Sequence, residues 1–263
     1  MRTSLFALAL AAWFGGRLTN VAADPIAVGD PRMTLPTGAG TVSAVLAVNL
    51  SKDAGFEPVS VAPDLWYGAS ARLSLGLVHS GRAASGFFGD TADSLCLRSA
   101  THGCPRLYDR VGMLARYHLR DGRLTVALEG GLLVRGFEPF TLGAKAGVVA
   151  RWQRGRLAVD LAPNLWLGLA HRAGADAGRL NLPVAVTCAL TSRFALAAQS
   201  GLWAPLRDPS GNAVVPLSVG AEVLATNLLV IDLAFSLPAL IDGDDATDAA
   251  DARTLTVGVG HEF

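Results

Sequence analysis

The sequence predicts an all-β fold, in which about twelve antiparallel strands run up and down and close into a transmembrane β-barrel. Three observations predict it. Apolar and polar residues alternate through most of the chain, the breaks between alternating stretches are in turn short and mostly longer, and aromatic residues gather beside the short breaks. Because successive side chains of a strand point to opposite sides, alternation gives each strand one apolar and one polar face.

The composition fits strands that cross a membrane. Hydrophobic residues make up 51% of the 263 residues, yet no uninterrupted apolar run approaches the roughly 18 residues that a spanning helix needs. The apolar residues are therefore spread over alternating strands. The formal net charge is zero at pH 7, which gives no electrostatic reason to expect a nucleic-acid partner.

The N-terminus is expected to be processed. Arg2 precedes a dense apolar run at residues 5–14, and Val21-Ala22-Ala23 forms a small-residue cleavage site, so residues 1–23 are interpreted as a secretory signal peptide. Residues 24–38 are rich in Pro and Gly, show no period, and are expected to form a periplasmic lead-in. The barrel is then expected to occupy residues 39–263.

Each strand is assigned where the alternation runs unbroken. Short breaks such as RDG and QRG join the strands in pairs, while longer, more polar breaks follow each pair, and many strands approach the nine to eleven residues of a tilted transmembrane strand. Pro63 and Pro163 each remove a ladder hydrogen bond and so require a bulge or an edge. The expected strands are 41–51, 59–67, 72–80, 108–119, 123–135, 140–152, 156–170, 179–190, 193–204, 214–224, 228–240 and 253–263.

The last strand carries the most specific motif. In RTLTVGVGHEF, apolar residues alternate with threonine and glycine, and the sequence ends on Phe263. This resembles the C-terminal signature strand of Gram-negative outer-membrane β-barrels, although His261 stands where that family usually has an apolar residue. The resemblance implies location in the outer membrane, contact with its lipid and lipopolysaccharide, and recognition of this strand by the barrel-assembly machinery. The closing strand of a soluble β domain is the alternative.

Aromatic residues favour the membrane interpretation. Five of them lie beside the short breaks or at the C-terminus, and strand parity places all five on the apolar face. Aromatic rings prefer the membrane interface, whereas the aromatic residues of a soluble core need not collect at one end. The expected girdle consists of Tyr67, Tyr117, Trp152, Phe194 and Phe263.

The polar faces of the strands are expected to line the lumen. They carry charges of both signs, together with Trp66, Trp166 and Trp203, which favour a restricted passage. The same faces would be the exterior of a soluble sheet. The expected lumen residues are Asp64, Arg72, Arg110, Arg116, His118, Glu129, Arg135, Lys145, Arg151, Asp160, Asn164, Gln199, Glu222, Asp232 and Glu262.

These features predict a narrow pore or transporter for small hydrophilic solutes, which selects by size and field without a cofactor or a covalent step. A plugged structural or adhesive barrel that acts through its surface loops, chiefly residues 81–107, is the alternative. A lipid-modifying enzyme is less favoured. Outer-membrane lipid hydrolases use a His and a Ser two residues apart on one strand face, whereas Ser80 directly follows His79, and no catalytic residue is assigned.

Two connections carry further chemistry. Cys96 and Cys104 lie in the longest connection and are the candidate disulfide, since export permits one, whereas a metal site with His102 would lack a fourth ligand. Cys188 lies within an apolar strand and is interpreted as a small hydrophobe. The acidic loop at 241–252 lacks the pattern of an EF-hand, so a solvated loop is favoured over a Ca²⁺ site, and no metal site is predicted.

Overall fold

The computed structural model describes residues 33–50, 59–90, 95–98, 108, 110–170, 177–207, 209, 212–242 and 253–263. The predicted signal peptide, most of the lead-in, Cys104 and nearly all of the acidic loop lie outside these ranges. Among the described residues, no helix is long and apolar enough to cross a membrane.

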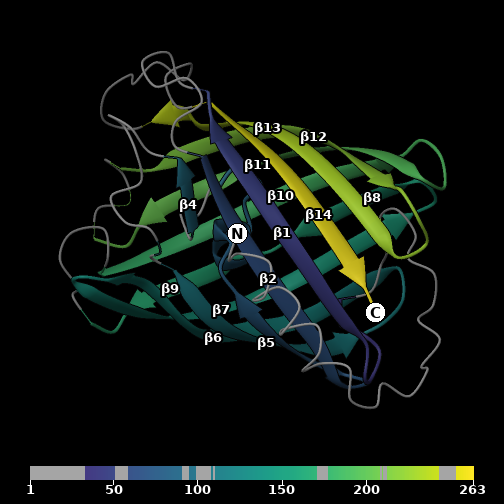
Figure 1. The fold of residues 1–263 in the computed structure, drawn as a ribbon, viewed down its shortest axis with the longest axis horizontal. Coiled ribbons are helices and arrows are strands. Elements are labelled where there is room, and N and C mark those ends of the chain that lie inside the picture. The colour runs from purple at the N-terminus through teal and green to yellow at the C-terminus, as the bar shows by residue number, and fades with distance from the viewer. Residues whose placement is uncertain are drawn as a thin grey trace, which may run out of the picture.

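The strands form one antiparallel sheet that closes on itself (Figure 1). β1 pairs with both β2 and β14, so the first and last strands join the two edges of the sheet. The strands are β1 (Gly40–Asn49), β2 (Val59–Ser70), β3 (Leu73–Val78), β4 (Leu95–Arg98), β5 (Val111–Arg120), β6 (Leu124–Phe137), β7 (Phe140–Arg154), β8 (Leu157–Leu161), β9 (Asn164–Gly168), β10 (Gly178–Ala189), β11 (Phe194–Pro205), β12 (Val214–Leu224), β13 (Leu229–Asp242) and β14 (Thr254–Glu262).

These segments fill twelve positions around the barrel. β8 and β9 share one position between β7 and β10, while β4 pairs with β2 beyond the point where β3 ends. The predicted closed antiparallel barrel of about twelve strands is therefore confirmed. Closure gives the backbone N–H and C=O groups of both edge strands hydrogen-bond partners, so the sheet has no open edge.

The two prolines act differently on their strands. The predicted continuous strand 156–170 is wrong, because it breaks at Ala162 and Pro163 into β8 and β9. Pro163 has no N–H for the ladder, although its carbonyl oxygen still accepts a bond of 2.9 Å from the Val148 N–H. Pro63 stays within β2, at the level where pairing passes from β3 to β4, so one of its two neighbouring ladders is already interrupted.

The two ends of the barrel differ in their connections. At one end, here called the short-turn end, brief turns join β2 to β3, β5 to β6, β7 to β8, β10 to β11 and β12 to β13. β1 also begins at this end, and β14 ends there. At the opposite end, here called the long-connection end, most connections are longer. The two-residue turn between β6 and β7, which contains the cis Glu138-Pro139 peptide, is the exception.

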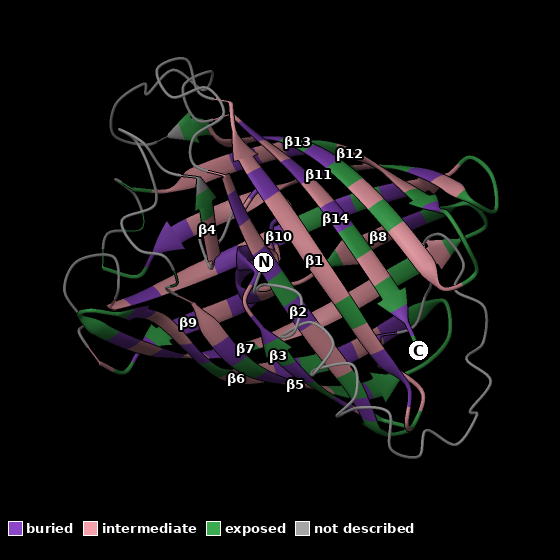
Figure 2. Cartoon of the chain, in the orientation of Figure 1, coloured by how far each residue is buried: buried purple, intermediate pink, exposed green. Residues whose placement is uncertain are grey.

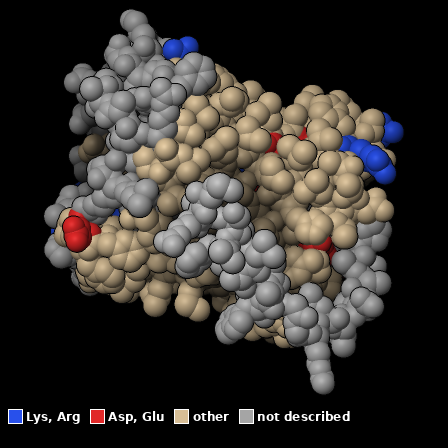
Figure 3. Space-filling view, viewed as in Figure 1, with Lys and Arg blue, Asp and Glu red and all other residues tan. Residues whose placement is uncertain are grey.

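The outer surface of the barrel is apolar. Exposed and buried residues alternate along the strands (Figure 2), and the exposed positions include Met113, Leu128, Leu132, Val219 and Leu233. In the face shown in Figure 3, few charged side chains interrupt the surface. Such a sheet has its polar side turned inward, which is the reverse of a soluble β domain.

A short helix, α2 (Gly81–Ser85), follows β3 and lies inside the barrel. The Ser80 side chain caps its N-terminus by accepting a hydrogen bond from the Ala83 N–H, and Gly86 ends it in the left-handed conformation with φ of 88°. The sequence pattern predicted only a long connection here. Residues 80–90 are called the inner segment below.

Candidate functional site

The predicted lumen residues lie on the interior face of the barrel with one exception. Arg72 lies in the turn between β2 and β3 and is exposed, because the strand pairing stops before it. The others are buried or half-buried. Asp64, His118, Glu129, Lys145, Asn164, Gln199 and Glu262 are buried, and Arg110, Arg116, Arg135, Arg151, Asp160, Glu222 and Asp232 are half-buried.

The interior charges pair across neighbouring strands. Glu129 on β6 lies between two cations, because Lys145 Nζ on β7 is 2.6 Å from its Oε1 and Arg116 on β5 donates to its Oε2 from both Nε and Nη2. Arg151 Nε lies 2.9 Å from Asp160 Oδ1 on the adjacent β8. Buried charges are tolerated only when they are paired in this way.

The inner segment is held at its start by Asp64. The Asp64 carboxylate accepts hydrogen bonds from the backbone N–H groups of His79 and Ser80, at 2.6 and 2.9 Å from Oδ1, and from the Ser80 hydroxyl on Oδ2. The backbone thereby leaves the wall after Val78 and turns into the lumen. The Ser80 hydroxyl serves both this turn and the helix cap.

Polar side chains from the opposite walls hold the middle of the segment. Lys145 Nζ donates to the Ala83 carbonyl oxygen at 2.7 Å, and Asn164 Nδ2 donates to the Ser85 carbonyl oxygen at 2.7 Å. Gln199 donates to the Gly86 carbonyl oxygen at 2.9 Å and accepts from the Phe88 N–H. These side chains satisfy backbone groups that the short helix leaves unpaired.

A long-range ion pair completes the attachment. Arg82 Nη1 lies 2.7 Å from Asp232 Oδ1 on β13, and Arg82 Nη2 donates to Thr256 Oγ1 on β14 at 3.1 Å. Small residues let the segment approach the wall, since a Cβ on Gly89 would overlap the Ser236 side chain. The inner segment therefore crosses the lumen from β2 to β13 and β14.

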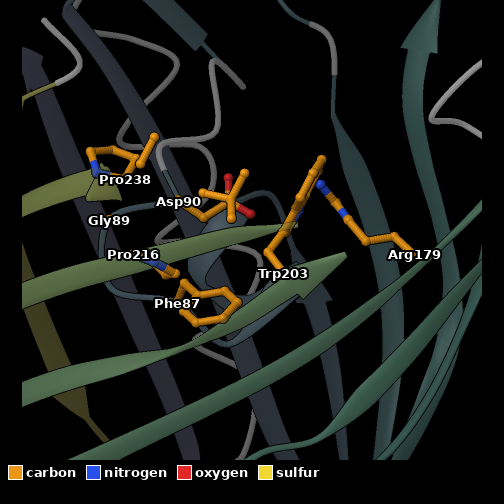
Figure 4. Close-up of a pocket in the computed structure, with 9 residues that line it drawn as sticks. Phe87, Gly89, Asp90, Arg179, Trp203, Pro216 and Pro238 are labelled. Carbon is orange, nitrogen blue, oxygen red and sulfur yellow. The ribbon is translucent and has the colours of Figure 1, made fainter. Parts of the chain in front are cut away.

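Cavities lie on both sides of the inner segment. One of about 330 Å³ faces the long-connection end and includes Trp203, Pro216 and Pro238 in its lining (Figure 4). Another of about 300 Å³ faces the short-turn end and is lined by residues that include Trp66 and Arg116. Among the described residues, the inner segment therefore separates these two cavities.

Arginine charges gather around Asp90 at the end of the inner segment. Burial alone would raise the pKa of Asp90, but the charges of Arg110, Arg179 and Arg135 and a hydrogen bond with Ser85 lower the pKa below its ordinary value. Asp90 therefore stays ionised at neutral pH. Its carboxylate binds the segment electrostatically to the surrounding wall.

Each of the three lumen tryptophans carries a stacked arginine. The Arg116 guanidinium carbon lies 4.8 Å from the centroid of a Trp66 ring, with Arg135 at 4.9 Å from Trp166 and Arg179 at 5.0 Å from Trp203. Stacking of this kind restrains a long side chain and leaves its N–H edge available for hydrogen bonds.

The five predicted girdle residues lie at the short-turn end. Tyr67, Tyr117, Trp152 and Phe263 are exposed, and Phe194 is half-buried. Phe263 also closes the barrel, because it exchanges two backbone hydrogen bonds of 2.8 and 2.9 Å with Gly40. Their contact with a membrane interface stays a prediction.

The cysteines differ in state. Cys96 in β4 is disulfide-bonded, whereas Cys188 in β10 is free. The predicted partner of Cys96, Cys104, lies outside the described residues. Within the described ranges, no group of three or more His, Cys, Asp or Glu residues could hold a metal ion.

Sequence reasoning missed the inner segment. The stretch SGRAASGFFGD does carry a signal, because Ser80 suits a helix N-cap, Gly86 suits a helix end, and the small residues between them fit a confined space. Nothing local in that stretch distinguishes the interior of a barrel from its surface.

Comparisons with known proteins place the fold. No family model and no curated protein matches the sequence. Among solved structures, the NanC porin has a TM-score of 0.56 and 10% identity, over 84% of this chain and 98% of that chain. The KdgM porin in complex with disordered oligogalacturonate has a TM-score of 0.54 and 9% identity, over 85% and 99%. The COG4313 outer membrane channel from Pseudomonas putida F1 has a TM-score of 0.51 and 12% identity, over 90% and 100%.

At these identities the similarity concerns the fold. It agrees with the apolar outer surface and the charged interior, and with the expected location in the outer membrane. The chain therefore has the fold of the outer-membrane β-barrel proteins.

Proposed function

We propose that this protein is a narrow outer-membrane pore for small hydrophilic solutes. The observation that carries the proposal is the lumen itself, which is lined by paired charges and holds cavities of about 330 and 300 Å³ on either side of a polar inner segment. A barrel stabilised by a packed interior alone would favour apolar side chains there, since buried ion pairs are weak contributors to stability.

The inner segment sets the width of the proposed passage. Its anchors are side-chain hydrogen bonds and ion pairs to the wall, many of them to its own backbone. Such contacts exchange readily with water when the segment shifts, unlike an apolar core. The solute would pass beside the segment and be selected by size and charge, with no covalent step.

Single-channel recording in planar bilayers tests the proposal. Wild-type protein in KCl is expected to give reproducible conductance steps. Gln199→Ala removes both Gln199 hydrogen bonds to the inner segment and is expected to raise the step size or its fluctuation. Gln153→Ala, the same substitution near the short-turn end of β7, is the matched control and is expected to leave the steps unchanged.

Folding is verified separately from conduction. A folded barrel migrates differently on SDS gels before and after boiling, so this assay reports the barrel in every variant. Folded wild-type protein that stays electrically silent would refute the pore and favour a plugged barrel that acts through its surface loops.

A further inference from the structure

The short-turn end of the barrel carries an arc of exposed arginines. They lie in the turns that join β2 to β3, β5 to β6, β7 to β8 and β10 to β11, or at the strand residue beside the turn, and these strand pairs follow one another around the sheet. Some basic side chains of this end are visible at the right-hand edge of Figure 3. The six exposed residues, here called the arginine arc, are Arg72, Arg120, Arg123, Arg154, Arg156 and Arg193.

The charge of this rim is positive when every acidic residue that could lie there is counted. Asp121 is the one acidic residue in the four turns, which the structure describes throughout. The chain before residue 33 contains only Asp24 and Asp30, and the chain ends on one carboxylate. The remaining acidic residues outside the described ranges fall in connections of the opposite end. Even with all of these included, four negative charges stand against six positive ones.

The guanidinium groups of the arc are available to a ligand. Among the described residues, none of the six forms an ion pair with a carboxylate. Arg156 Nη1 donates to the Leu190 carbonyl oxygen at 3.4 Å, which links two neighbouring turns and leaves the arginine charge uncompensated. A guanidinium binds the oxygens of a phosphate group with two parallel hydrogen bonds.

The predicted aromatic girdle lies at the same end as the arc. Trp152 stands two positions before Arg154, and Phe194 directly follows Arg193. Aromatic rings of a barrel lie at the membrane interface, so the arginines just beyond them lie at the level of the lipid phosphates. The turn between β12 and β13 contains no charged residue, so the arc covers only part of the rim.

We propose that the arginine arc binds anionic phospholipids, of the kind represented by phosphatidylglycerol, in the leaflet at the short-turn end. The phosphodiester accepts hydrogen bonds from the arginines, and the acyl chains lie against the apolar outer surface. Phosphatidylcholine has the same phosphate, but its quaternary ammonium group cancels the charge. An arginine close to an anionic membrane surface is worth about fivefold in affinity. Lipid binding needs no conduction, so this proposal and the pore fail separately.

Quenching of Trp152 fluorescence by brominated lipids tests the proposal. Trp152 is the outward-facing tryptophan among the described residues, whereas Trp66, Trp166 and Trp203 lie in the lumen. The protein is folded into phosphatidylcholine vesicles that contain a small fraction of phosphatidylglycerol or phosphatidylcholine brominated near the headgroup. Trp152→Phe gives the signal of the other tryptophans, which is subtracted. Brominated phosphatidylglycerol is expected to quench like brominated phosphatidylcholine at about threefold or higher mole fraction. Equal quenching by the two lipids overturns the proposal.

Neutralising the arginines nearest to Trp152 locates the lipid. Arg123 belongs to this group because its carbonyl oxygen accepts a bond of 2.9 Å from the Gln153 N–H, and Arg154 and Arg156 follow Trp152 in its own turn. The triple change of these arginines to glutamine is expected to bring the preference down to about one, as is about 1 M salt, which shortens the Debye length to about 3 Å. Arg207→Gln, at an exposed residue of the long-connection end, is expected to keep the preference. An unchanged preference in the triple variant, with the folded gel band intact, refutes the site.

A second reporter separates the arc from the rest of the rim. Val259 is exposed on the outward face of β14, between the two ends of the arc. The double variant Trp152→Phe with Val259→Trp is expected to show a smaller preference for phosphatidylglycerol than Trp152 does. Equal preference at the two reporters would mean that the lipid does not gather at the arginines, and it would overturn the proposal.

Discussion

Removing the charge of Glu129 is expected to destabilise the barrel strongly. Its carboxylate lies between Lys145, whose Nζ is 2.6 Å away, and Arg116, whose Nε is 2.9 Å away. The Lys145 side chain is 3% exposed and that of Arg116 is 28% exposed, so Lys145 has little water to replace its lost partner. Glu129→Gln keeps the shape but leaves both cations without the carboxylate charge.

The size of the effect follows from burial. Breaking a buried ion pair by removing one partner costs about 3 to 5 kcal/mol, because the remaining charge stays desolvated. With a guanidinium dependence of about 4 kcal/mol per molar, this corresponds to a fall of about 1 M in the unfolding midpoint. Equilibrium unfolding in lipid vesicles, followed by tryptophan fluorescence, measures it.

Two further variants isolate the cause. Glu138→Gln makes the same change at an exposed position and is expected to stay within about 0.5 kcal/mol of wild type. The double variant Glu129→Gln with Lys145→Met removes a cation as well and is expected to lose less than the sum of the two single variants. Equal midpoints for Glu129→Gln and Glu138→Gln would show that the buried charge cluster does not stabilise the barrel.

Two further predictions test barrel closure and the membrane-facing surface. Gly40→Val is expected to lower the folded fraction on unboiled SDS gels, because even a Cβ at residue 40 would lie 2.5 Å from the Phe263 ring. The control Gly260→Ala, whose Cβ would meet only Ser43 at 3.7 Å, is expected to fold normally. Equal folding of the two variants would contradict a role of the contact between residue 40 and Phe263 in barrel closure. Val219→Arg changes an outward-facing residue at the middle of β12 and is expected to lower the free energy of unfolding in vesicles by about 2 to 4 kcal/mol. Val223→Arg, on the same face near the short-turn end, is expected to cost about 0 to 1 kcal/mol. Equal costs would refute a bilayer centred on the middle of the strands.

The strand pattern by itself determined the fold class, and its alternation predicted which residues of a strand face the interior. Tyr117 is exposed and His118 is buried, as their alternation predicted, because a period of two is a local property of extended backbone. The short turns were recognisable for the same reason, since they interrupt that period. The local pattern showed that Pro163 has no N–H for the ladder, but it did not show whether the sheet would bend around the proline. In the structure the predicted strand breaks there into β8 and β9.

Only the tertiary structure decided where the connection after β3 goes. Arg82 meets Asp232 across 150 positions in sequence, and Lys145 meets Ala83 across 62. Such pairs exist only once the barrel has closed, since closure brings opposite walls within reach of one segment. The sequence therefore determined that the barrel has a charged interior. The closed fold decided that residues 80–90 cross that interior, because their position depends on contacts between residues far apart in sequence, which no periodic pattern within one strand reveals.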